Sequence, residues 1–479
     1  MTSQLLMLRE NTPSDAKVNF GFIILISSVA ALGGFLFGYD SGCINGAIDA
    51  LQVAFNASNL GSGFNVASML LGCAVGAFMA GGLADKFGRR PTLFVSAILF
   101  GISAFGSGIA GGSLVFIMFR LIGGFAVGAA SIISPAYISE IAPAAYRGRL
   151  SSLQQLAIVL GLFLAFLSNY LIAAAAGGAS ETFWLGYEAW RWMFWVELIP
   201  VALFGLGLFL IPESPRYLVA VGRKEEAQVI LGKISHPDDA ANKVASIQKT
   251  VSSERKPKLS DIFKDGTKKL HPIVWVGLAI AALQQLVGIN VVFYYGAVLW
   301  KTAGFSEADA LKINVIGGII NVVSTVVAIA LVDKWGRKPL LLTGSAGMAI
   351  FLGVLAVIFG TANVDAAGDL QLSGSAGTVA LICANCYIIM FGISWGPVMW
   401  VMLGEMFPNR IRGAALAVAG LSQWITNFAV TMTFPILLAS IGLGGAYGLY
   451  AGFALISFFI VKAIVRETKG RTLEDMQAD

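Results

Sequence analysis

Long apolar stretches without charge recur along almost the whole chain, and they restrict the possible folds more than any other feature. Windows such as 20–31, 92–112 and 273–283 contain no charged residue. A helix that crosses the hydrocarbon core of a bilayer needs about 20 mainly apolar residues. Only 12% of the 479 residues are charged, whereas soluble chains carry about 25%. The sequence therefore predicts a protein that spans a membrane many times.

The apolar runs are continuous and do not alternate every second residue, which favours helices over the strands of a barrel. We expect an all-α membrane protein with twelve transmembrane helices, at residues 20–41, 62–84, 91–111, 113–139, 149–173, 190–211, 272–300, 308–332, 339–361, 376–404, 412–438 and 444–465.

Lys and Arg gather in alternate connections between these spans, and cytoplasmic loops are enriched in both residue types. The loops after spans 1, 3, 5, 9 and 11 contain neither, and Lys301 and Lys312, which flank the loop after span 7, are the exceptions. We expect both termini in the cytoplasm, and we read the net charge of +5 as an orientation signal rather than as nucleic-acid binding. The loops after spans 2, 4, 6, 8 and 10 carry Lys86, Arg89, Arg90, Arg147, Arg149, Arg216, Lys334, Arg337, Lys338, Arg410 and Arg412.

Two short motifs occur twice at a similar spacing. DKFGRRP at 85–91 matches DKWGRKP at 333–339, and EIAP at 140–143 matches EMFP at 405–408. Two independent repeats of this kind indicate a duplicated unit of six spans. We expect an N-terminal six-helix bundle at 1–211, a cytoplasmic helical linker at 212–271 and a C-terminal six-helix bundle at 272–479. Within the linker, 224–234 has helical periodicity, with apolar residues at 227, 230, 231 and 234.

The repeated motifs suggest charged pairs at the cytoplasmic ends of the spans. Their glycines permit a tight turn between two helices, and their basic residues are placed to pair with the acids that end spans 4 and 10. We expect such pairs to latch the two halves in one state, and the alternative is positive-inside anchoring alone. The candidate latch residues are Asp85, Arg89, Arg90, Glu140, Arg147, Asp333, Arg337, Glu405 and Arg412.

Twelve spans in two related halves suggest transport by alternating access, with a site near the midplane. Neutral amides and aromatic rings in the spans suit a sugar, because each amide offers donors and an acceptor to hydroxyl groups. The alternative is that buried amides only hold helices together. Span 7 carries Gln284, Gln285, Asn290 and Tyr294, and a helix that is broken or loosened at Gly288 would widen the choice of ways in which these amides can meet. Other spans contribute Gln154, Gln155, Asn321, Trp400, Gln423, Trp424 and Asn427.

The charged residues that lie away from the ends of the spans are in the first half. Asp40 in span 1 is a default functional candidate, because a carboxylate is costly in hydrocarbon. Arg120 in span 4 and Glu197 in span 6 are the other charges that lie away from the ends of this half's spans. We expect Arg120 to hold Asp40 ionised and to release it for protonation when the helices shift. The N-terminal half is thus the candidate for proton coupling, and the C-terminal half for sugar binding.

Together with further motifs, these residues resemble the major facilitator superfamily and, within it, the sugar porter family. The motifs are PESPR at 212–216, QQLVGIN at 284–290, WGPVMW at 395–400 and ETKG at 467–470, where Arg466 replaces the usual Pro. The chain looks most like bacterial xylose–proton symporters and glucose carriers of that family. The resemblance implies that a hexose is held by Gln155, Gln284, Gln285, Asn290, Trp400 and Gln423 and, less directly, by Tyr294, Asn321 and Trp424.

The resemblance also bears on the substrate, the coupling and the location. Leu162 stands where the xylose symporter has a further Gln, which favours glucose or a similar hexose. Proton-coupled members have Asp at the position of Asp40, but some bacterial facilitators keep it, so facilitated diffusion stays open beside symport. We expect a monomer in the bacterial inner membrane, in contact with lipid.

Other classes of protein fit less well. An enzyme would need a nucleophile, a metal or an acid–base set facing a cavity, so we expect no catalytic residue, cofactor or metal site. An organic-anion carrier would place Arg or Lys deep in the spans of the second half, where the sequence has none. A sugar sensor without transport shares the fold features, but such proteins tend to have long cytoplasmic extensions, and the tails here are short.

Overall fold

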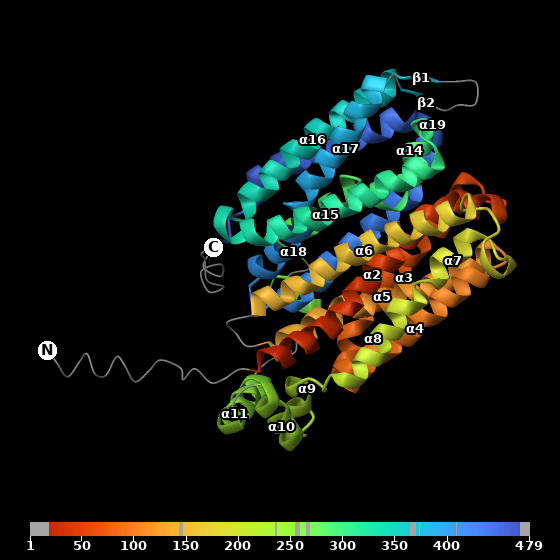
Figure 1. Ribbon diagram of the computed structural model, residues 1–479. Helices are drawn as coiled ribbons and strands as arrows, with labels where there is room; N and C mark the ends of the chain where they lie inside the picture. The colour runs from red at the N-terminus through yellow and green to blue at the C-terminus, as the bar shows by residue number, and fades with distance from the viewer. Residues whose placement is uncertain are drawn as a thin grey trace.

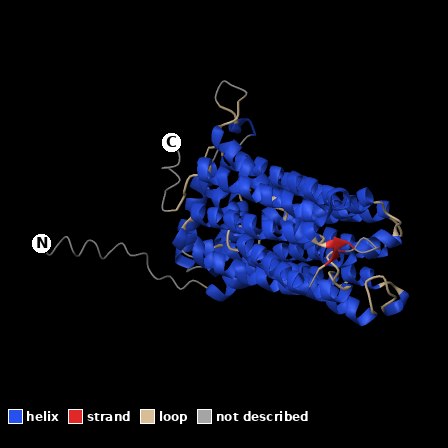
Figure 2. Cartoon of the chain, turned by 90° about the horizontal axis from the view of Figure 1, so that it is seen from above, coloured by secondary structure: helices blue, strands red, loops and turns tan. Residues whose placement is uncertain are grey.

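Two bundles of long helices lie side by side in the computed structural model, which describes residues 19–469 apart from 143–146, 235–236, 254–258, 265–268, 365–369, 373 and 409. The N-terminal half contains α2 to α8, drawn red to yellow-green in Figure 1, and the C-terminal half contains α12 to α19, drawn green to blue. Seen from above, helices make up nearly all of the described chain (Figure 2). The prediction of an all-α fold is confirmed.

The N-terminal half begins at a side-chain cap, since Asn19 accepts a hydrogen bond from the amide of Phe22. Gly88 separates α3 from α4 with φ of 99°, a conformation that favours glycine. The elements are α2 (Phe20–Ala54), α3 (Asn59–Phe87), α4 (Arg89–Ile109), α5 (Ser113–Ile141), α6 (Arg147–Ala176), η1 (Trp184–Gly186), α7 (Ala189–Trp195) and α8 (Leu198–Leu210).

The C-terminal half repeats the glycine turn, with Gly336 at φ of 93° between α15 and α16. Its last helix is divided by Gly442 at φ of 69°. The elements are α12 (Pro272–Leu286), α13 (Ile289–Tyr294), α14 (Gly296–Thr302), α15 (Glu307–Trp335), α16 (Arg337–Thr361), β1 (Asn363–Val364), β2 (Leu370–Gln371), α17 (Gly374–Gly392), α18 (Trp395–Met406) and α19 (Arg412–Ile464).

Eleven helical segments among the described residues are long and apolar enough to cross a membrane. The last of them is α19, which the break at Gly442 divides into the two spans predicted at 412–438 and 444–465, so the expected number is recovered. Span 1 was predicted to end at 41, but α2 continues to Ala54. Asp40 thus lies inside the helix, where its carboxylate pairs with Arg120 of α5.

Small residues allow close packing within the N-terminal half, as is common between membrane helices. A Cβ on Gly38 of α2 would lie 1.8 Å from the carbonyl oxygen of Ile158 in α6. Reciprocally, a Cβ on Gly161 of α6 would lie 2.0 Å from the carbonyl oxygen of Phe35. These contacts fix α6 against α2 and so place the residues around Asp40.

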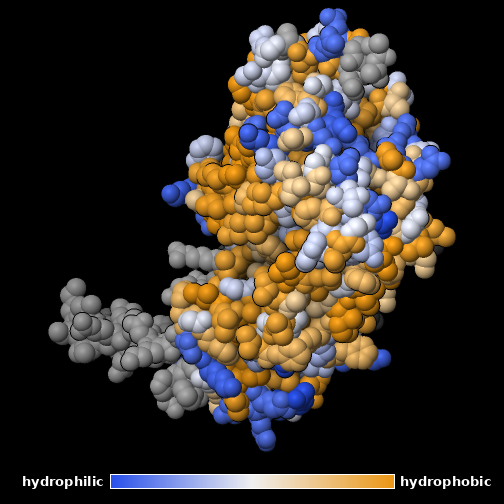
Figure 3. All heavy atoms as spheres, turned by 45° about the vertical axis from the view of Figure 1, so that its right-hand side comes forward, coloured by the Kyte–Doolittle hydropathy of each residue, from blue (hydrophilic) through white to orange (hydrophobic). Residues whose placement is uncertain are grey.

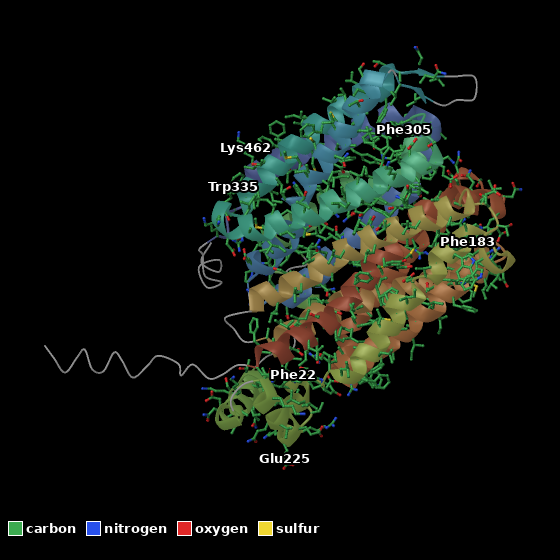
Figure 4. All side chains as sticks on the ribbon, in the orientation of Figure 1. Phe22, Phe183, Glu225, Phe305, Trp335 and Lys462 are labelled. Carbon is green, nitrogen blue, oxygen red and sulfur yellow. The ribbon has the colours of Figure 1, made fainter. Side chains whose placement is uncertain are left out.

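The linker folds into α9 (Pro215–Ala220), α10 (Lys224–Ile234), α11 (Pro237–Ser253) and η2 (Leu259–Ile262). The helix predicted at 224–234 is confirmed, and its buried residues Ala227 and Leu231 pack with Leu218 of α9. Asn19 donates its backbone amide to the carbonyl of Ile234 at 3.2 Å. We call this side of the molecule the linker end. Glu225 marks it in Figure 4, whereas Phe183 and Phe305 mark the far end.

The surface matches a protein embedded in lipid. Apolar side chains cover wide areas of both halves in Figure 3, and strongly hydrophilic residues gather at the tip formed by the linker. Exposed apolar residues come from helices of both halves, for example Phe209 of α8 and Val357 of α16. Exposed apolar areas of this extent mark a surface that contacts a membrane or another protein.

Candidate functional site

Span 7 is broken at the glycine that the sequence offered as a point where the helix could open. Gly288 has φ of 82° and separates α12 from α13, and Tyr295 separates α13 from α14. The hydroxyl of Tyr387 donates to the carbonyl of Val287 at 2.8 Å, which satisfies a backbone group freed by the break. A Cβ at position 288 would lie 2.6 Å from the ring of Tyr450. Both the backbone conformation and the lack of space therefore require glycine here.

Three amides predicted to share a site form a continuous chain of hydrogen bonds across this break. Asn290 Nδ2 donates to Gln285 Oε1 at 2.6 Å, and Gln285 Nε2 donates to Gln284 Oε1 at 3.1 Å. Gln284 Nε2 in turn donates to the carbonyl of Trp395 at 2.9 Å. The chain fixes the orientation of each amide, and each amide keeps further donor or acceptor capacity for sugar hydroxyls.

The predicted residues of α19 differ in their surroundings. Trp424 packs against Phe37 of α2, with ring centroids 5.6 Å apart. Gln423 is buried, and its Oε1 has no hydrogen-bond partner within the described part of the chain. Asn427 accepts a hydrogen bond from Thr431 and lies beside the hydroxyl of Tyr294. The contact of Trp424 with Phe37 therefore lies at the boundary between the halves, where alternating access requires a site.

The remaining predicted amides and rings differ in their surroundings. Asn321 Oδ1 lies near Gly392 of α17, so this side chain packs inside the C-terminal half and not in the amide chain. Gln154 faces Gly34 of α2, whereas its neighbour Gln155 is half-buried. Trp400 is 39% exposed, so its side chain is only partly covered by the rest of the chain.

The ionisable residues of the N-terminal half form a buried cluster. Arg120 Nη1 pairs with Asp40 Oδ1, and Arg120 Nη2 lies 2.9 Å from the sulfur of Met69. Asp40, Arg120 and Glu197 are each 1% exposed. Asp40 Oδ2 and Glu197 Oε2 have no hydrogen-bond partner among the described residues. The structure thus brings together all three predicted residues and leaves two carboxylate oxygens able to receive a proton.

This cluster is adjacent to the amides through α2. Ser41 follows Asp40, and its side chain lies beside the hydroxyl of Tyr294 in α13. Leu162 of α6 is buried with its Cδ1 against Gly42, at 3.2 Å from the position of a Cβ there. A movement of α2 relative to α13 therefore changes the surroundings of both sets of residues.

The charged pairs at the linker end correct one expectation. Arg89 pairs with Glu140 at 2.9 Å, and Arg337 pairs with Glu405 at 2.7 Å. The pairs themselves are as predicted, but each lies within one half, so neither joins the two halves directly. The physical reason is that each glycine loop and the acid that it meets belong to the same six-helix unit.

The other predicted latch residues have different partners. Asp85 and Asp333 pair with the arginine four residues later, at 3.4 and 3.1 Å. Arg90 donates to the carbonyl of Leu208 at 2.8 Å, and Arg412 to that of Phe407. Arg147 begins α6, but its side chain lies outside the described residues.

Sequence reasoning missed several residues in these clusters. Ser214 donates to Glu140 at 2.5 Å, and Thr468 donates to Glu405 at 2.6 Å. Ser214 belongs to the PESPR motif and Thr468 to ETKG, and each directly follows a Glu, which was the signal that could have marked them.

Asn45 and Asn314 form a buried pair between the halves. No repeated motif marks either of them.

Comparison with known proteins gives a consistent result. The family described as sugar (and other) transporter matches residues 26–479. The chain is 55% identical to the glucose transport protein of Synechocystis sp., over 97% of this chain and 99% of that protein. It is 39% identical to the D-xylose-proton symporter of Escherichia coli K12, over 97% of each chain. The inward open structure of the xylose transporter XylE from E. coli matches with a TM-score of 0.81 at 38% identity, over 95% of this chain and 99% of that one.

Proposed function

The chain belongs to the sugar (and other) transporter family, and on this premise we propose that it carries glucose or a similar hexose across the bacterial inner membrane by alternating access. The two rigid units are the N-terminal bundle at 1–211 and the C-terminal bundle at 272–479, joined by the linker at 212–271. Both termini and the linker lie in the cytoplasm, and the protein works as a monomer.

The observation that carries this proposal is the hydrogen-bonded chain of Asn290, Gln285 and Gln284 across the break at Gly288. Three neutral amides held in fixed orientation suit an uncharged ligand with several hydroxyls, and their mutual bonds avoid the cost of unpaired buried amides. The break also allows α13 to change its angle to α12, so that ligand binding and closure are linked. The other sugar-binding residues in this proposal are Gln155, Tyr294, Asn321, Trp400, Gln423, Trp424 and Asn427.

Glucose is preferred to xylose for two reasons. Leu162 stands where the xylose symporter has Gln, so this chain lacks one donor at that position. The relative that is 55% identical is named a glucose transport protein, whereas the xylose symporter is 39% identical.

Proton coupling is the second element of the proposal. The Asp40–Arg120 pair is buried, and separating such partners leaves a charge in a medium where it is costly. Protonation of Asp40 removes that cost and permits the movement, with Glu197 as the neighbouring carboxylate. A sugar–proton symporter needs this dependence of helix movement on protonation.

Reconstituted protein tests both elements. Uptake of labelled glucose, galactose and xylose into proteoliposomes is measured with and without an imposed pH gradient, inside alkaline. We expect glucose to be preferred and to accumulate above its external concentration only with the gradient. Absence of uptake for all three sugars would contradict the proposal that the substrate is a monosaccharide.

Facilitated diffusion remains the second candidate, because the ion pair of Asp40 with Arg120 would also stabilise a carrier that binds no proton. The distinguishing measurement is the pH of a weakly buffered suspension of de-energised cells after sugar is added. Symport makes the medium alkaline. Uptake without a pH change, and insensitive to a protonophore, would establish facilitation.

A further inference from the structure

One side chain of the N-terminal half holds two helices of the C-terminal half. Asn45 of α2 donates its Nδ2 to the carbonyl of Phe293 in α13 at 2.6 Å. Asn314 of α15 donates its Nδ2 to Asn45 Oδ1 at 2.8 Å. Asn45 and Asn314 are both buried. The side-chain amide of Asn45 therefore forms hydrogen bonds to the C-terminal half with both its NH2 group and its oxygen.

The helix held in this way carries proposed sugar ligands. α13 contains Asn290 in its first turn, and Tyr294 directly follows Phe293. It has only six residues and lies between two breaks, so few of its backbone groups are satisfied within the helix. The carbonyl of Phe293 is in the last turn, where helices lack internal donors, and Asn45 supplies one from the other half.

The junction after α13 is packed directly onto this amide pair. A Cβ on Gly296 would lie 2.3 Å from Asn314 Oδ1 and 2.9 Å from Asn45 Nδ2. The absence of a side chain at position 296 thus lets the backbone of α14 approach both amides. The ring of Phe293 adds an apolar contact across the same boundary, with its centroid 6.3 Å from that of Phe166 in α6.

Two more polar contacts join the halves farther out, at the far end. Asp49, one helical turn beyond Asn45 on α2, pairs with Lys301 of α14 at 2.5 Å. Glu307 at the start of α15 accepts from the backbone amide of Ala179 at 2.9 Å. Figure 4 shows Phe183 and Phe305, close in sequence to Ala179 and Glu307, at this end. The Asp49–Lys301 pair is partly exposed and hence weak, whereas the side-chain amides of Asn45 and Asn314 are shielded from water.

We propose that Asn45 and Asn314 are positioning residues that hold α13 closed over the outer side of the sugar site. This inference rests on the proposed transport function. Outward opening must break both amide hydrogen bonds, and the freed groups then bind water that enters with the opening. The pair thus sets the balance between the outward-closed and outward-open states without contacting sugar in the closed state.

The test reports closure of the far end without using sugar. In the variant D49C/K301C, a short bifunctional thiol reagent links α2 to α14 in reconstituted protein only while this end is closed. This variant also removes the outer ion pair, so closure depends more strongly on the buried amides. We expect Asn45→Leu and Asn314→Leu, each added to it, to lower the rate of linking by about tenfold. The control is Asn385→Leu, since Asn385 bonds only to Leu381 in its own helix among the described residues.

Linking at the parent rate in both Asn45→Leu and Asn314→Leu would overturn the inference, as would an equal loss in Asn385→Leu. Because Asn45→Leu removes two buried hydrogen bonds and can prevent folding, Asn45→Ser is the second variant, and we expect an intermediate rate from it. Sugar uptake by the same variants is measured separately. A chain that closes as expected but carries no sugar would contradict the proposed function and leave the closure result intact.

Discussion

Glu213 and Glu467 occupy corresponding positions in the two halves, and each carboxylate accepts hydrogen bonds from the first two backbone amides of a long helix. Glu213 accepts from Arg89 and Arg90 at the start of α4, at 3.0 and 3.2 Å. Glu467 accepts from Arg337 and Lys338 at the start of α16, at 3.0 and 2.9 Å. A carboxylate at a helix N-terminus satisfies free amides and interacts favourably with the helix dipole.

The two acids are expected to differ in their contribution to stability at neutral pH. Burial raises the pKa of Glu213 and outweighs the backbone amides that favour its charge. Burial also acts on Glu467, but four backbone amides together outweigh it and lower the pKa of this carboxyl. A carboxyl whose pKa is lowered by folding stabilises the fold at pH values above the ordinary pKa of a Glu. This contribution is lost as the pH falls through the pKa of the folded state. A carboxyl whose pKa is raised by folding instead destabilises the fold at neutral pH.

We therefore expect Glu467→Gln to destabilise the protein at pH 7 by about 1 kcal/mol, the usual size for charge-assisted hydrogen bonds. Glu213→Gln should leave stability unchanged or slightly higher, and it serves as the matched control. Thermal unfolding in detergent between pH 4 and pH 8 measures both. The Glu467→Gln deficit should shrink toward pH 4, and a deficit of equal size for Glu213→Gln at pH 7 would be inconsistent with the difference in pKa.

The buried ion pair leads to a prediction about coupling. Asp40→Asn keeps the shape of the side chain but removes the charge that Arg120 pairs with. Accumulation of glucose driven by a pH gradient should disappear, while exchange of labelled for unlabelled sugar across the membrane should persist. Asp49→Asn, on the same helix but partly exposed, is the control and should still accumulate sugar. Gradient-driven accumulation by Asp40→Asn would show that this carboxylate does not carry the proton.

The sequence predicted the grouping of the amides and the pairing of the arginines with Glu140 and Glu405, but not that each ion pair stays within one half. Gln285 and Asn290 lie within one segment, and the conformational freedom of Gly288 indicates how they can meet. Whether the Arg89–Glu140 pair joins the two halves depends on which helices pack together, a property of the six-helix unit that no local pattern contains. Asn45 is one polar residue in an apolar span. Only its hydrogen bonds to α13 and α15 in the folded protein show that it joins the two halves.

The amide chain predicts unequal effects of its members on sugar affinity. Asn290 is half-buried and bonds to one neighbour, whereas Gln285 is buried and bonds to two. We expect Asn290→Ala to weaken glucose binding by about tenfold, equivalent to ~1.4 kcal/mol for a lost hydrogen bond. Gln285→Ala should weaken it more, because Gln284 and Asn290 then lose their orientation. Quenching of tryptophan fluorescence by glucose measures both, with Asn385→Ala as control, and normal affinity in Gln285→Ala would exclude the chain from sugar binding.

Leu162 provides a test of sugar selectivity. It lies seven residues after Gln155, which places both on one face of α6. Leu162→Gln adds an amide of similar size at the position where the family resemblance implies a Gln in the xylose symporter. Uptake of xylose relative to glucose should rise, and the variant should lose about 1–3 kcal/mol of stability wherever the new amide lacks a partner. Leu162→Met keeps the volume without adding donors, so it should retain the parent preference. Competition between labelled glucose and unlabelled xylose in proteoliposomes measures the ratio, and an unchanged ratio in Leu162→Gln would remove this position from the determinants of selectivity.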